Sequence, residues 1–192
     1  MPLLTAKADP GQINFLNGPI PAVQITLSNP LSGTSEPLPT TPGAFQFQLF
    51  VAPANTANPL DFAPTNVRGT NITAAPGRMF GGIGVQTETV LAGEHKAILV
   101  RGWSTSLGNE YDVALQNWLV GEPGYFGTSA IAPDFIFGGF DGTGPIPAST
   151  AFAGAFGIQS GFALVAIPEP TVFSMLLGGG IYMFFRRKPA RY

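Results

Sequence analysis

Large apolar and polar side chains alternate in several short segments of this sequence, most regularly in "FQFQLFV". The apolar positions of that segment are Phe45, Phe47, Leu49 and Val51, and glutamines stand between the first three. Because successive side chains of a β-strand point to opposite faces, a period of two predicts a half-buried strand. A chain built from such segments must bury one face of a sheet.

Other segments extend this pattern along the chain. "AVQITL" (residues 22–27) and "FGIQSGFALVAI" (156–167) also alternate, and the continuous apolar run "KAILVRGW" (96–103) is typical of a central strand. Turn-forming stretches rich in Gly, Pro, Ser and Thr separate them, and only 10% of the residues are charged. We therefore predict an all-β fold, a β-sandwich of the jelly-roll or immunoglobulin-like kind.

One segment, "GNEYDVALQNWLVGEPG", has a helical period instead. Tyr111, Leu115 and Trp118 recur at i, i+4 and i+7, which places them on one face of a helix. Asn109 is a suitable N-cap, and Gly121 is a suitable stop. The prediction is one short helix packed on the sheet.

The charges are unevenly distributed. Residues 9–167 contain four basic and ten acidic side chains, a net charge of −6, whereas the last seven residues carry +4. An acidic body excludes nucleic acid as an expected partner, because binding phosphates needs a basic surface. The chain has no Cys and one His, so we expect neither a thiolate nucleophile nor a zinc site.

Candidate catalytic groups are sparse. His95 is expected at a turn that leads into a strand, and Glu110 and Asp112 are expected as acids at a helix start. Asp134 and Asp141 flank "FIFGGF", and the "DGTG" that begins at Asp141 lacks the spacing of an EF-hand calcium loop. The body is therefore predicted to be non-enzymatic, with no cofactor and no metal.

The N-terminus contains a small-x-small sequence at Ala6-Lys7-Ala8, the form of a signal-peptide cleavage site. The residues before it are too few and too polar to be a complete signal peptide. Residues 1–8 are interpreted either as the remnant of a signal peptide, with a mature start near Asp9, or as a plain disordered N-terminus. The sequence leaves these alternatives open.

The C-terminus ends in an apolar stretch and a basic cluster. Residues 171–185 contain no charge, and as a helix they would span about 22 Å at 1.5 Å per residue, less than the ~30 Å of a bilayer core. The stretch is apolar on every face, and four cations follow it: Arg186, Arg187, Lys188 and Arg191. This order predicts a single transmembrane helix with its basic flank in the cytoplasm.

Pro168-Glu169-Pro170 stands directly before this stretch. The triplet, the short apolar span and the terminal basic cluster together resemble the PEP-CTERM sorting signal, over residues 167–192. The resemblance implies an exported protein of a Gram-negative bacterium that is recognised by an exosortase, an integral-membrane cysteine protease or transpeptidase. It further implies a transient inner-membrane anchor with a periplasmic body, followed by delivery to the cell surface or the exopolysaccharide matrix.

We therefore expect three parts: residues 1–8, an exported body at 9–166, and a sorting signal at 167–192. The leading hypothesis is a non-enzymatic surface or matrix protein, with exopolysaccharide as a further partner. An alternative is a carbohydrate- or calcium-binding matrix module. A third hypothesis is an exported hydrolase that uses Asp134 and Asp141.

Overall fold

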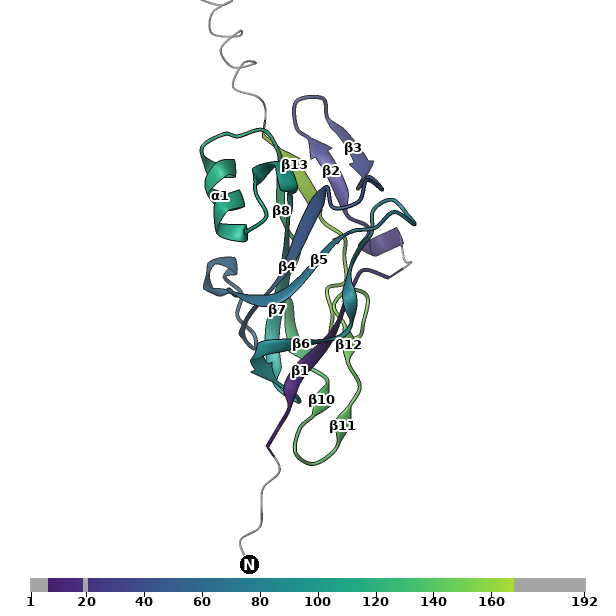
Figure 1. Ribbon diagram of the computed structural model, residues 1–192, viewed down its shortest axis with the longest axis vertical. Coiled ribbons are helices and arrows are strands. Elements are labelled where there is room, and N and C mark those ends of the chain that lie inside the picture. The colour runs from purple at the N-terminus through teal and green to yellow at the C-terminus, as the bar shows by residue number, and fades with distance from the viewer. Residues whose placement is uncertain (1–6, 19–20, 168–192) are drawn as a thin grey trace, which may run out of the picture.

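The computed structural model describes residues 7–18 and 21–167 of the chain, and this part is mostly β (Figure 1). Its strands are β1 Pro10–Leu16, β2 Thr26–Asn29, β3 Thr34–Pro37, β4 Phe45–Pro53, β5 Ala63–Asn71, β6 Met79–Leu91, β7 His95–Ser104, β8 Tyr125–Thr128, β9 Ala132–Ile136, β10 Gly139–Phe140, β11 Pro145–Ile146, β12 Ser149–Thr150 and β13 Ala163–Ala166. The helical elements of the described residues are one α-helix and three short 3-10 turns. They are α1 Tyr111–Leu119, η1 Pro21–Val23, η2 Pro59–Asp61 and η3 Thr105–Leu107. The all-β prediction with one short helix is confirmed.

Eleven of the strands form one continuous sheet in the order β12-β1-β6-β5-β4-β7-β8-β13-β2-β3, with β9 paired to β7. Most neighbours are antiparallel, but β1 with β12 and β2 with β13 are parallel. The sheet curls strongly, and β10 and β11 form a separate small ribbon at one end of the molecule (Figure 1).

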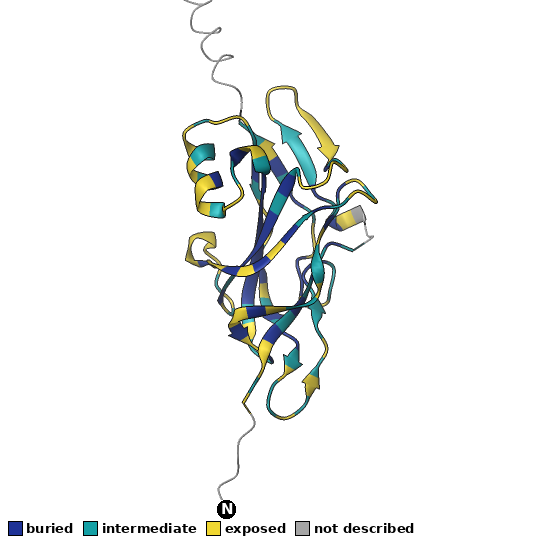
Figure 2. Cartoon of the chain, in the orientation of Figure 1, coloured by how far each residue is buried: buried dark blue, intermediate teal, exposed yellow. Residues whose placement is uncertain are grey.

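The centre of the sheet is the antiparallel pair of β4 and β7. Nine consecutive residue pairs join them, from Phe45 with Ser104 to Pro53 with Lys96. All residues of β7 from 97 to 104 are buried, as the dark centre of Figure 2 shows. The prediction of a central strand at 96–103 is confirmed.

β4 is also buried on both faces, so the prediction that it is half-buried is wrong: Gln48 and Phe50 lie under other elements.

The concave face of the curled sheet encloses the main core. Aromatic rings meet there from distant parts of the chain: Phe47 lies edge-on to Phe162 at 6.4 Å between ring centroids, and Phe162 stacks with Phe152 at the same distance. Each fully buried side chain of this size contributes roughly 1.5–3 kcal/mol relative to exposure. The fully buried members from the sheet include Ile13, Phe15, Phe47, Leu49, Val67, Ile98, Val100, Phe135 and Leu164.

The predicted strand at 22–27 is only partly present. Residues 21–23 form η1, and β2 begins at Thr26. Val23 and Ile25 are buried as the alternation suggested, but the Asn17 side chain binds the nearby backbone by donating to Val23 O at 2.9 Å and Gly77 O at 2.8 Å. A side chain thus takes the place of a neighbouring strand.

The predicted strand at 156–167 is likewise shorter, since only β13 (163–166) is extended in the sheet. Gly161 lies so close to another backbone segment that a Cβ there would be 1.8 Å from Gln24 O. Its N–H donates to Ala22 O at 2.7 Å. A direct backbone contact therefore replaces the strand pairing expected before Phe162.

We predict that Gly161→Ala destabilises the protein by about 3 kcal/mol, because the added methyl group must displace the backbone at residue 24. Gly144→Ala is the matched control, since a Cβ at that position meets no atom within 4 Å. Chemical denaturation of both variants measures the difference. Equal midpoints for the two variants would contradict the prediction.

Candidate functional site

Helix α1 covers the convex face of the sheet beside β4, β7 and β8. The prediction that Tyr111, Leu115 and Trp118 face the sheet is confirmed. All three pack against a cluster that contains the fully buried Trp103. The Trp103 indole donates to Gly108 O at 2.8 Å, directly before the helix. The predicted cap is wrong. Glu110, not Asn109, is the N-cap residue, and its side chain does not cap the helix.

Arg101 on β7 connects this helix to the rest of the convex face. Its guanidinium lies 4.4 Å from the centroid of the Phe50 ring and 5.0 Å from that of Tyr111. It donates to Pro59 O at 2.7 Å and to the Tyr111 hydroxyl. Within the described residues it belongs to no ion pair. Aromatic faces and a carbonyl thus satisfy the buried cation, which ties η2 and α1 to the sheet.

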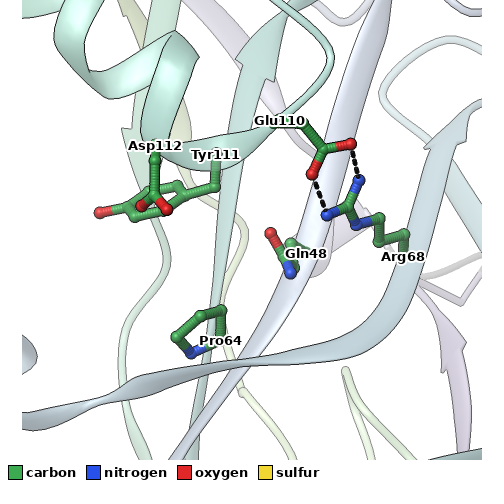
Figure 3. A pocket seen from close by; sticks show the side chains of 6 residues that line it. All are labelled: Gln48, Pro64, Arg68, Glu110, Tyr111 and Asp112. Carbon is green, nitrogen blue, oxygen red and sulfur yellow. Dashed lines mark hydrogen bonds and ion pairs between the residues drawn. The ribbon is translucent and has the colours of Figure 1, made fainter.

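A small cavity of about 90 Å³ lies at the N-terminal end of α1 (Figure 3). It is lined by Gln48, Pro64, Arg68, Glu110, Tyr111 and Asp112. Gln48 is only 4% exposed, and its Nε2 donates to Thr65 O at 2.6 Å. Its Oε1 accepts no hydrogen bond from the described residues, and in Figure 3 it points away from Pro64 toward the helix side of the cavity. A buried acceptor without a donor is costly, and this oxygen exposes less than 1 Å² of its own surface, so its hydrogen-bonding capacity stays unused by the described residues.

Arg68 and Glu110 form the rim of this cavity through a bidentate ion pair. Arg68 Nη1 is 2.8 Å from Glu110 Oε1, and Nη2 is 2.5 Å from Oε2. Hydrogen bonding to Arg68 holds the pKa of the Glu110 carboxyl below its usual value and raises the pKa of the guanidinium. Both side chains are substantially exposed, so the pair orients polar groups and adds little stability.

Arg68 also lines a second, shallower hollow of about 290 Å³ on β4, β5 and β6. Its other lining residues are Gln46, Gly69, Thr70, Phe80 and Gly81, and the Phe80 ring is half-exposed. We call the two hollows together the polar groove. It offers amides, a hydroxyl, a guanidinium, carboxylates and an aromatic ring, a set suited to hydrogen bonding a neutral polar ligand.

The remaining predicted chemical groups serve local structure. His95, at the start of β7, pairs through Nδ1 with Asp134 Oδ1 at 2.8 Å, and both are exposed. Asp141 Oδ1 accepts from the N–H and hydroxyl of Thr143, both at 2.7 Å, and from Gly144 N at 2.9 Å. These bonds lower the pKa of Asp141 and close a tight turn. The described residues contain no group of three or more His, Asp or Glu side chains placed to hold a metal.

The predicted sorting residues Pro168, Glu169, Pro170, Arg186, Arg187, Lys188 and Arg191 lie outside the described residues, as do the expected transmembrane helix and Ala6 of the expected cleavage site. Within residues 7–18 and 21–167, no helix is long and apolar enough to cross a membrane. Ala8 is described, and Asp9 next to it is bound to the body: its N–H donates to Phe140 O at 2.8 Å.

The sequence-based search missed Gln48 and Arg68. One signal was present, since both glutamines of "FQFQLFV" fall on the polar face of a strand. The alternation predicts that this face is exposed to solvent, whereas the folded chain places Glu110 and Tyr111 over it.

We predict that Arg101→Lys lowers the free energy of unfolding by about 1–3 kcal/mol, because an ammonium cannot stack on two rings and also reach Pro59 O. The control is Arg68→Lys, which changes an exposed guanidinium and should cost less. Urea denaturation followed by tryptophan fluorescence measures both. A smaller loss for Arg101→Lys than for the control would refute this account of the buried cation.

Comparison with known proteins adds no relative: no family model, no curated protein and no solved structure matches this chain.

Proposed function

We propose that this chain is an exported protein of a Gram-negative bacterium that an exosortase sorts through its C-terminus. The observation that carries the proposal is the order of parts in residues 167–192: a Pro-Glu-Pro triplet, a short apolar span and a terminal basic cluster. The positive charge after the span favours a cytoplasmic end, and the acidic body then lies across the inner membrane. The final location is the cell surface or the exopolysaccharide matrix.

The body is proposed to be a non-enzymatic β-sandwich. The curled sheet encloses the main core, where Phe47 of β4 meets Phe162, directly before β13, and this enclosure supports the sandwich proposal. The acidic residues considered for hydrolysis have other partners: Asp134 pairs with His95, and Asp141 closes a turn. These engagements favour a structural role over a pair of catalytic carboxylates.

We predict that replacing Pro168, Glu169 and Pro170 together by Ala blocks processing in a host that encodes an exosortase. The unprocessed chain should keep its full mass and stay with the inner membrane, because the recognised triplet is lost while the apolar span remains. Mass spectrometry of fractionated cells measures both properties. The control replaces Thr34, Ser35 and Glu36 on the exposed edge strand β3 by Ala. Unchanged size and location of the triplet variant would refute the sorting proposal.

A second candidate function, the binding of a neutral carbohydrate by the body, is favoured by the polar groove. Arg68, which is exposed at the rim, would donate a hydrogen bond to a sugar hydroxyl, and the Gln46 and Thr70 side chains line the same open hollow. Phe80 offers a half-exposed ring against which a pyranose can pack.

We predict that the body binds oligosaccharides through this groove. Full-length protein in detergent would be titrated with cellotriose, maltotriose and chitotriose by calorimetry. Phe80→Ala should weaken binding about tenfold by removing the ring against which the sugar packs, and Thr143→Ala, on the distant turn, should leave it unchanged. Absence of binding by all three sugars, or equal binding by both variants, would defeat this candidate.

A further inference from the structure

The last strand of the body, β13, runs toward the end of the molecule at which the described residues finish, at Ile167 (Figure 1). β13 lies parallel to β2, with Val165 opposite Ser28, and antiparallel to β8, with Ala166 opposite Tyr125. The tip of the β2–β3 hairpin, residues 30–33, and the segment from α1 to β8, residues 120–124, therefore lie at this same end. The β10–β11 ribbon lies at the opposite end (Figure 1).

The body leaves almost no free chain before the apolar span. Ile167 N donates to Gly124 O at 3.1 Å, so the chain is still attached to the body one residue before Pro168. The apolar span begins at residue 171. The three residues between them can bridge at most about 11 Å, and the polar layer on one side of a bilayer is roughly 5–8 Å thick.

Exposed apolar side chains are present at this end. Leu31, at the hairpin tip, is 57% exposed, and Leu119 and Val120, at the end of α1, are 69% and 68% exposed. We call these three residues the apolar rim. Because β2 runs parallel to β13 and ends at Asn29, Leu31 lies two residues past the end of β2. It is therefore at the same end of the molecule as Ile167. Val120 is four residues before Gly124, which holds Ile167.

We propose that the apolar rim is a membrane-facing surface, which contacts the periplasmic leaflet of the lipid bilayer while the C-terminal span is inserted. This inference rests on the proposed function for the span itself. The short tether selects lipid as the occupant, because a reach of about 11 Å across a polar layer of roughly 5–8 Å keeps this end within a few ångströms of the headgroups. Insertion of Leu and Val into the interface then buries apolar area that is exposed in the described body. The Pro-Glu-Pro triplet would consequently be presented at the lipid surface under a docked body.

The absence of cysteine allows a direct test with single-cysteine variants of the full chain. Leu31→Cys and Val120→Cys place a fluorophore on the apolar rim. Leu60→Cys on η2 is a control with an exposed apolar side chain elsewhere, and Pro145→Cys on β11 marks the opposite end. Each protein is reconstituted into phosphatidylethanolamine and phosphatidylglycerol vesicles that contain a headgroup-linked quencher.

We expect several-fold stronger quenching at residues 31 and 120 than at residues 60 and 145. Insertion of a flexible Gly-Ser linker of about ten residues between Ile167 and Pro168 should remove most of that difference, because the body can then leave the surface. If the protein floats with the vesicles and quenching is equal at all four positions, the apolar rim proposal is overturned. The proposal of a membrane anchor is then unaffected. Failure of the full chain to float with the vesicles overturns the membrane anchor itself, and with it the inference.

Discussion

The nine-residue pairing of β4 with β7 is the interaction on which the rest of the structure depends. Both strands have apolar side chains on both faces, so one face alone cannot bury them. Leu49 and Val100 face the main core, while Phe50 and Leu99 face outward and need a second cover. The curled sheet supplies the first cover, and Phe62 (directly after η2), Tyr111 of α1 and Ile131 supply the second. Three apolar clusters are the result: the main core on one face, and on the other face the clusters around Phe50 and Trp103, which share Tyr111.

That second cover creates the polar groove. Helix α1 can lie on the convex face only if the buried cation of Arg101 is satisfied, and the rings of Phe50 and Tyr111 do this. Once Tyr111 is placed, Glu110 is brought beside Arg68, and Gln48 is enclosed beneath them. The candidate binding groups are therefore neighbours because of a packing requirement.

The termini of the described body lie at opposite ends, which has consequences for topology (Figure 1). Asp9 is held by backbone hydrogen bonds near the β10–β11 ribbon, while Ile167 is held beside α1 and the β2–β3 hairpin. If the C-terminus is anchored in a membrane, the N-terminal end and the Asp141 turn point away from it. The polar groove would then lie on the side of the body and remain accessible to solutes.

Local patterns in the sequence determined the elements that depend on near neighbours. The alternation in "FQFQLFV", the apolar run at 96–103 and the helical period at 111–118 correspond to β4, β7 and α1, because each pattern matches the geometry of its own element. The proposed sorting signal at 167–192 is likewise a local pattern of charge and apolarity. Tertiary structure alone decided where strands end and which polar groups meet. At Gly161 a backbone contact with residue 24 prevents the strand that the alternation predicts. At Gln48 the start of α1, more than 60 residues downstream, covers a face that the alternation predicts to be exposed. Such contacts join distant segments, and no short window of sequence contains both partners.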